Sequence, residues 1–128
     1  MGHKLYDIKV RAKIEAQRVA MNEAMADVFD QCDIVIASTN PDVAFGCDGP
    51  MPQMIDGNNV PLGNNGALTI PANIYGNPAI SIPAGQVRGL PVGLQVLAPH
   101  HREPWLLDLA LAFERARPWP LTAPGTPA

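Results

Sequence analysis

Residues 66–95 read GALTIPANIYGNPAISIPAGQVRGLPVGLQ, and this stretch decides the fold. Two apolar runs have the composition of short strands: 79–82 lies within this stretch, and 92–97 starts within it and ends two residues after it. Only nine residues, 83–91, join the two runs. A parallel crossover needs a dozen or more residues, so we expect these strands to pair antiparallel as a wide hairpin.

Gly93 lies within the second of these strands, on the face that it shares with Gln95. Glycine inside a strand often marks the close approach of another group. We therefore expect this face to meet a close neighbour. That neighbour is either a long helix predicted at 103–117 or a surface that the chain lacks.

A short helix is predicted just ahead of the strands, at 69–75. Thr69 suits the N-cap, Pro71 suits the first helical position or one near it, and Gly76 ends the helix.

Upstream, 4–30 is predicted as an amphipathic helix, because neither Gly nor Pro interrupts it and its apolar residues share one face. These residues are Ile14, Met21, Met25 and Val28. The β-branched run 33–37 follows directly and indicates a strand buried on both faces, with Cys32 buried at the junction.

The segment 41–66 holds four prolines and five glycines and is predicted as one long loop. A loop of this length in a compact domain usually has a functional or interface reason. Its scattered apolar residues, such as Phe45, Met51 and Met54, need something to pack on. This is the first indication that a covering surface is missing from the chain.

Downstream, 103–117 is predicted as a second long helix that Pro104 opens at its first position and Pro118 ends. Its wide apolar stripe predicts burial on more than one side, and the tail 119–128 is expected to be extended. The stripe consists of Leu106, Leu107, Leu109, Ala110, Leu111 and Phe113. Helices alternating with three visible strands indicate a mixed α/β layer.

Composition narrows the function classes. The 128 residues make one domain or part of one, and two cysteines are too few for a disulfide scaffold. Charged residues are only 16%, which suggests more buried surface than a small monomer has.

The net charge of −3 argues against nucleic acid as a partner. No apolar run approaches a membrane span and no signal peptide is visible, so we expect no membrane partner and a cytoplasmic location.

Catalytic signatures are missing from the residues themselves. Cys32 and Cys47 lack the spacing of zinc ligands, and the adjacent His100 and His101 point opposite ways on an extended segment. Ser81 alternates with apolar residues in a strand, where a structural hydroxyl is expected, and the three lysines all lie within the first 13 residues. Nucleophilic catalysis needs a base within reach of the nucleophile, so the residues alone predict no active site, metal or cofactor.

The motifs of 66–95 resemble the C-terminal signature region of the amidase signature family. This family of serine hydrolases includes aliphatic and aryl amidases and the amidase subunit of tRNA-dependent amidotransferases. Its pattern has Thr, Pro-x-Asn, Gly-x-Pro, Ile-Ser-x-Pro-x-Gly and Gly-Leu-Pro-x-Gly-Leu-Gln. The matching residues are Thr69, Pro71, Asn73, Gly76, Pro78, Ile80, Ser81, Pro83, Gly85, Gly89, Leu90, Pro91, Gly93, Leu94 and Gln95. The flanks agree at 32–36, at 39–41 and at Glu103, Leu107 and Trp119, so the resemblance covers about residues 5–120.

The resemblance implies that 1–128 is the C-terminal segment of the amidase signature fold, a mixed sheet segment flanked by helices. Family members carry a Ser–cis-Ser–Lys triad in their N-terminal half, and this chain has no Gly-Gly-Ser-Ser-Gly run and no lysine beyond Lys13. The N-terminal catalytic half of the same enzyme is then the expected partner. Its serine would attack the amide carbonyl, and water would hydrolyse the acyl-enzyme. This chain would supply scaffold and cleft wall, with Thr69 and Asn73 as substrate-binding residues and no catalytic residue, and we expect it to be inactive alone.

Two positions depart from the family pattern. Ala37-Ser38 stands where the family often has a proline before the threonine. Gly66 stands where the tRNA-dependent subunits often place an acid that helps hold the glutamine donor. The second departure favours a general amidase over a tRNA-linked one. The amide substrate itself stays open, because specificity in this family is set by loops largely outside this region.

Two other classes of function stay open. The chain could be a non-catalytic interaction module that dimerises through its exposed core, or a free-standing enzyme with a cryptic site. A Gly-Gly-Ser-Ser-Gly segment and a preceding lysine encoded upstream of Met1 would decide for the amidase. We expect the chain to form homo-oligomers, because three strands leave at least one open sheet edge and the apolar stripe of 103–117, with Met51 and Met54, leaves apolar patches.

Overall fold

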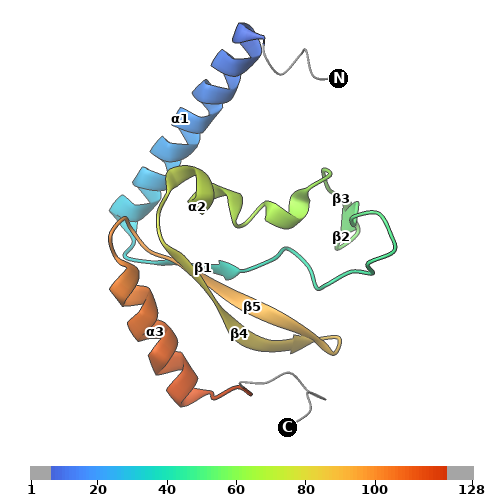
Figure 1. The fold of residues 1–128 in the computed structure, drawn as a ribbon, viewed down its shortest axis with the longest axis vertical. Helices are drawn as coiled ribbons and strands as arrows, with labels where there is room; N and C mark the ends of the chain where they lie inside the picture. Colours follow the sequence, from blue (N-terminus) through green and yellow to red (C-terminus); the bar gives the residue numbers. More distant parts are fainter. Residues whose placement is uncertain (1–6, 121–128) are drawn as a thin grey trace.

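The computed structural model describes residues 7–120 and confirms a mixed α/β architecture (Figure 1). Along the chain the elements are α1 (Ile8–Gln31), β1 (Val35–Ser38), β2 (Met54–Ile55), β3 (Asn58–Asn59), the 3₁₀ helix η2 (Asn64–Gly66), α2 (Ile70–Tyr75), β4 (Ala79–Val87), β5 (Leu90–Leu97) and α3 (Glu103–Ala116). The tail beyond residue 120 and the predicted helix start at 4–6 lie outside the described residues.

The main sheet has the strand order β1-β5-β4, with both pairs antiparallel. The predicted antiparallel pairing is therefore confirmed, but the predicted width of the hairpin is wrong. Its strands continue to Val87 and from Leu90, which leaves a two-residue turn. Arg88 and Gly89 both have positive φ, 53° and 77°, as in the tight turns whose twist matches that of paired strands. A register shift between Pro83 and Gln86 absorbs the residues that suggested a longer loop.

One face of this sheet packs against α3 and forms a small core. Val96, Ala98 and Leu106 are buried together, and Ile34, Ile80, Leu94 and Leu109 pack around them. The first strand was predicted to be buried on both faces, which is wrong: Ile36 is 57% exposed. The reason is its position, since β1 is an edge strand and α3 lies against the β4 side of the sheet.

Helix α1 is confirmed, and its ends are capped. The Asp7 carboxylate accepts the Lys9 N–H at 2.7 Å, and the Cys32 N–H donates to the Val28 carbonyl at 3.1 Å. The amphipathic pattern predicted a buried face, but no residue of α1 is buried, and Ile14 is 47% exposed. Figure 1 shows its N-terminal half projecting away from the other elements.

The junction after α1 is also more open than predicted. Cys32 is exposed and not buried. Helix α1 packs against α2. The contact there includes the stacked rings of Phe29 and Tyr75, whose centroids lie 6.2 Å apart. The Cys32 thiol donates to the Val28 carbonyl at 3.2 Å.

The segment 41–66 is not one structureless loop. Its residues form the small hairpin of β2 and β3, and Asp56 and Gly57 turn the chain with positive φ of 49° and 75°. Its apolar side chains still lack cover, since Met51 and Met54 are 44% and 58% exposed.

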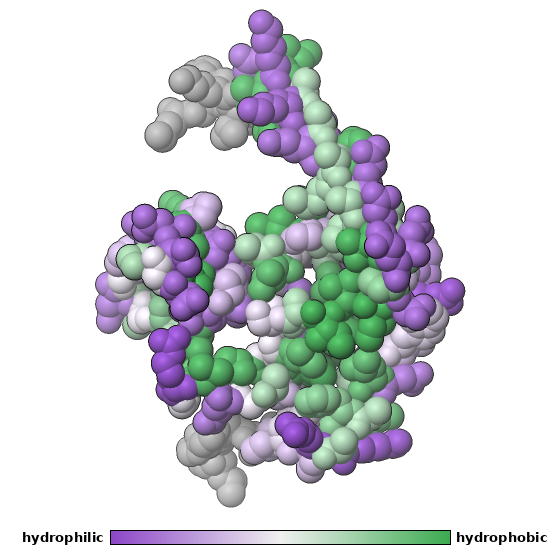
Figure 2. All heavy atoms as spheres, turned by 180° about the vertical axis from the view of Figure 1, so that it is seen from behind, coloured by the Kyte–Doolittle hydropathy of each residue, from purple (hydrophilic) through white to green (hydrophobic). Residues whose placement is uncertain are grey.

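Helix α3 matches its predicted range within a residue, although Pro104 is its second residue and not its first. Only one side of its apolar stripe is buried. Leu106 packs on the sheet, whereas Leu107 is 62% exposed and Leu111 is 44% exposed. Figure 2 shows hydrophobic side chains gathered on the half of the molecule that holds the sheet and α3.

Candidate functional site

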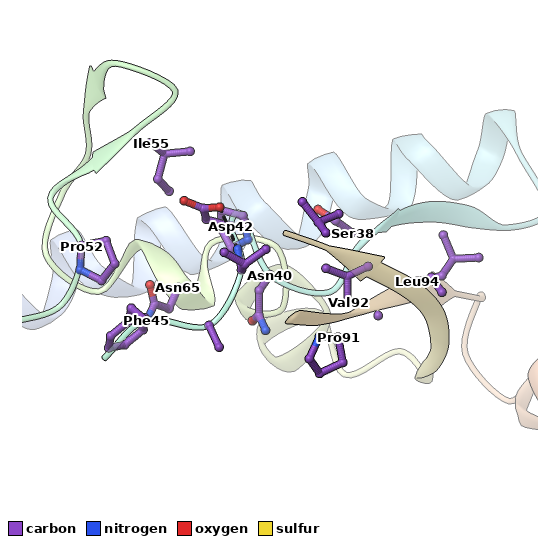
Figure 3. A pocket seen from close by; sticks show the side chains of 16 residues that line it. Ser38, Asn40, Asp42, Phe45, Pro52, Ile55, Asn65, Pro91, Val92 and Leu94 are labelled. Carbon is purple, nitrogen blue, oxygen red and sulfur yellow. Dashed lines mark hydrogen bonds between the residues drawn. The ribbon is translucent and has the colours of Figure 1, made fainter. Parts of the chain in front are cut away.

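A cleft of 530 Å³ opens between the hairpin end of the main sheet and the segment that follows β1 (Figure 3). Its size is typical of sites for small molecules. The lining residues are Ser38, Asn40, Pro41, Asp42, Val43, Ala44, Phe45, Pro52, Ile55, Asn65, Ala84, Val87, Pro91, Val92, Gly93 and Leu94. Figure 3 shows Phe45, Pro52 and Ile55 on one side of the cleft and Pro91, Val92 and Leu94 on the other.

One ion pair closes across the walls of this cleft. The Arg88 guanidinium, at the hairpin turn, donates to the Asp42 carboxylate at 2.9 Å, and the Val43 N–H donates to the same oxygen at 2.8 Å. The pair links two segments that lie 46 residues apart. It therefore holds the loop after β1 against the hairpin that forms the opposite wall.

A pair of hydroxyls lies beside the cleft, on the sheet face that faces away from α3. Thr39 Oγ1 and Ser81 Oγ share a hydrogen bond of 2.5 Å, and the Thr39 N–H donates to the Gly93 carbonyl at 2.9 Å. A Cβ at position 93 would lie 2.6 Å from each hydroxyl oxygen. The close neighbour of Gly93 within this chain is thus the hydroxyl pair, and the expectation that the second long helix lies there is wrong.

The two predicted substrate-binding residues do not line the cleft. Thr69 occupies the N-cap of α2 but does not cap it, because its hydroxyl donates to the Gly66 carbonyl at 3.2 Å. Asn73 is exposed on α2. Their role in substrate binding stays a prediction. The segment just before α2 is held to the main sheet by Gln95. This residue is 4% exposed and donates its side-chain amide N–H to the Leu68 carbonyl at 2.7 Å.

The chain was compared with models of known protein families. The family model described as Amidase matches residues 1–107. The chain belongs to the amidase family. The resemblance seen in residues 66–95 is confirmed.

Relatives of this amidase-family chain are much longer than it is. A glutamyl-tRNA(Gln) amidotransferase subunit of Listeria innocua is 38% identical over 103 residues, which cover 80% of this chain and 20% of the relative. The corresponding protein of Caldanaerobacter subterraneus is 36% identical over 113 residues, covering 87% and 22%. The chain spans about a fifth of the length of these curated relatives.

Solved structures show the same fold. A bacterial aryl acylamidase of the amidase signature enzymes superposes with a TM-score of 0.77 at 31% identity, over 91% of this chain and 25% of that one. The glutamyl-tRNA(Gln) amidotransferase subunit of Thermotoga maritima superposes with a TM-score of 0.67 at 28% identity, with the same coverage.

Within residues 7–120 of this amidase-family chain, neither hydroxyl of the Thr39–Ser81 pair is hydrogen-bonded to a base. Over the same range, His, Cys, Asp and Glu side chains form no cluster of three or more that could hold a metal ion. None of the helices in this range combines the length and the hydrophobicity of a membrane span. His100 packs on Tyr75 with ring centroids 4.4 Å apart, and its Nε2–H donates to the Tyr75 carbonyl at 3.0 Å. These two contacts hold the His100 side chain against the C-terminal end of α2.

The sequence did not reveal the cleft residues, and Asn40, Asn65 and Phe45 are the main omissions. They lie in or beside the segment predicted as a loop, where no periodicity marks which side chains turn inward. The only available signal was the segment itself, because a long loop with apolar residues usually has a functional or interface reason.

Proposed function

We propose that this chain is the C-terminal scaffold and one cleft wall of an enzyme that hydrolyses carbon–nitrogen amide bonds. The observation that carries the proposal is the match of residues 1–107 to the Amidase family. The cleft supports it, because a concave and mostly apolar site with a few polar groups is the usual form of a small-molecule site.

The catalytic serine and its base are proposed to come from a segment outside these 128 residues. Acyl transfer needs a nucleophile activated by a neighbouring base, and the Thr39–Ser81 hydroxyls hydrogen-bond to each other instead. In the whole enzyme the serine would attack the amide carbonyl, and backbone N–H groups would hold the oxyanion. The role of this chain is then to shape the cleft and to hold its walls together.

The walls suit that role because they are held from both sides. The register of β5 between β1 and β4 positions Leu94, and the Arg88–Asp42 ion pair holds the loop opposite it. Precise placement of a substrate beside its nucleophile contributes strongly to the rate of such reactions.

A chimera tests the proposal. The quarter of the bacterial aryl acylamidase that matches this chain is replaced by residues 1–128, and release of 4-nitroaniline from 4-nitroacetanilide is measured. We expect the chimera to hydrolyse the anilide, and we expect the chain alone and the acylamidase without its matched quarter to be inactive. A chimera that is folded by circular dichroism and monodisperse, yet inactive, contradicts the proposal and favours a non-catalytic interaction module.

A further inference from the structure

The side of α1 that faces away from α2 carries a line of exposed residues. Its other side packs against α2, where the rings of Phe29 and Tyr75 stack and the half-buried residues of α1 lie. Successive helical residues turn by about 100°, so residues at alternating spacings of four and three share one face. On the face opposite to α2 these residues, called the α1 stripe below, are Lys9, Lys13, Ala16, Ala20, Glu23 and Asp27, and all six are exposed.

Charge is sorted along the α1 stripe. Its two lysines lie toward the N-terminus, its two acids lie toward the C-terminus, and the two alanines separate them. The ion pairs within residues 7–120 are Glu15–Arg18 and Asp42–Arg88, so none of the four charged residues of the stripe takes part in one. This order is unfavourable in an isolated helix, because the macrodipole is positive at the N-terminus and negative at the C-terminus. A partner that brings acids to the lysines and lysines to the acids would relieve both ends.

The α1 stripe is complementary to itself when a second copy of the helix runs antiparallel to the first. A two-fold axis level with Arg18 places Ala16 opposite Ala20 of the second copy. The same axis places Lys13 opposite Glu23 and Lys9 opposite Asp27, and it repeats each pair in reverse. The alternating spacing of four and three is that of the seam between two supercoiled helices. Small alanines at its centre allow the helix axes to approach to about 8 Å, the close end of the usual range.

The shape of the chain leaves room for such a partner. Figure 1 shows the N-terminal half of α1 projecting away from the other described elements. In an antiparallel pair the rest of the second copy lies beside this projecting half, and the rest of the first copy lies beside the second copy's projecting half. Any other partner would need acids opposite Lys9 and Lys13 and bases opposite Glu23 and Asp27, whereas a second copy supplies both from the same residues.

We propose that α1 is a dimerisation helix, along which a second copy of this chain packs antiparallel on the α1 stripe. The Lys9–Asp27 and Lys13–Glu23 ion pairs set its register and direction, and Ala16 and Ala20 form its centre. The interface is isologous, because the same residues serve on both copies. This inference goes beyond the proposed function and does not depend on it.

Exchange of charge on the α1 stripe tests the inference. Lys9→Glu with Lys13→Glu makes the stripe wholly acidic, and Glu23→Lys with Asp27→Lys makes it wholly basic. All chains, the parent included, carry Leu107→Glu, so that the exposed side of α3 does not contribute. In sedimentation velocity we expect the dissociation constant of each variant alone to be about tenfold or more above that of the parent. An equimolar mixture of the two variants should associate at least as tightly as the parent, because every pair is again complementary.

Loss of association cannot be attributed to a melted helix, since both exchanges place charges that suit the macrodipole, and circular dichroism checks this. The matched control is Arg11→Glu with Arg18→Glu, which changes the net charge as the acidic variant does, in the same half of α1 but off the stripe. We expect the control to associate as the parent does.

Equal association of the parent and the acidic variant would overturn the inference. So would a mixture that associates no more tightly than its two components. If the same Lys9→Glu and Lys13→Glu changes instead lower the folded yield of the acylamidase chimera, the stripe contacts the rest of the enzyme and not a second copy.

Discussion

Replacing Gly93 by alanine should destabilise the fold, for a steric reason that the structure makes explicit. The new Cβ would lie 2.6 Å from Ser81 Oγ, 2.6 Å from Thr39 Oγ1 and 3.2 Å from Thr39 Cβ. Ordinary contacts of this kind begin at 3.4 Å. Each hydroxyl oxygen must therefore retreat by about 0.8 Å, which is the overpacking of a filled site.

The neighbours cannot retreat freely, because each belongs to a segment bonded to β5. Thr39 is held by its N–H bond to the Gly93 carbonyl, and Ser81 pairs in register with Gln95. Moving either hydroxyl also lengthens the 2.5 Å hydrogen bond between them. Overpacking costs about 1–3 kcal/mol, so we expect Gly93→Ala to lower the free energy of unfolding by that amount. Gly93→Val should cost more, because it adds two further methyl groups.

The assay is guanidinium unfolding followed by circular dichroism, with Gly46→Ala as the matched control. A Cβ at position 46 meets no atom within 4 Å, so the control should stay within about 0.5 kcal/mol of the parent chain. Removing the Ser81 hydroxyl should relieve one of the two clashes, so Ser81→Ala combined with Gly93→Ala should cost less than the sum of the two single changes. Equal stability of Gly93→Ala and Gly46→Ala would refute the reasoning.

Three further outcomes are expected. The chain alone should release no 4-nitroaniline from 4-nitroacetanilide above background, since no base among residues 7–120 is hydrogen-bonded to the Thr39 or Ser81 hydroxyl; release that Ser81→Ala abolishes would contradict this. The chain should self-associate at tens of micromolar in sedimentation velocity, because Leu107 and the edge of β1 are exposed, and Leu107→Glu should shift it toward monomer. A clean monomer that binds no hydrophobic dye would count against that expectation. Gln95→Ala should lower the free energy of unfolding by about 1–3 kcal/mol, because it leaves the Leu68 carbonyl without its donor; thermal melts unchanged from the parent would show that water replaces the amide.

Local signals in the sequence predicted the element types well. The uninterrupted stretch 4–30 and the Pro-bounded stretch 103–117 became α1 and α3, because helix formation depends on residues within a turn or two of each other. The antiparallel sense of β4 and β5 followed from the length of the connection. The tight turn at Arg88 did not, because Pro83 and Pro91 suggest the end of a strand when they are read without the register shift that accommodates them.

Burial was predicted less well than secondary structure. The apolar residues of α1, β1 and α3 form patterns that predict a covered face, yet Ile14, Ile36 and Leu107 are largely exposed. Periodicity reports which residues share a face and says nothing about whether a partner lies against it. The apolar patterns in these 128 residues match a family whose members are several times longer than this chain.

By itself the sequence determined the family and the order of helices and strands, because motif spacing and capping are properties of neighbouring residues. The tertiary structure alone decided which distant residues meet. Thr39 reaches Ser81 across 42 positions, and Arg88 reaches Asp42 across 46. Both contacts depend on the register of β5 between β1 and β4 and on the path of the loop after β1. Register and loop path minimise the free energy of the whole chain, so no short stretch of sequence encodes the cleft that they enclose.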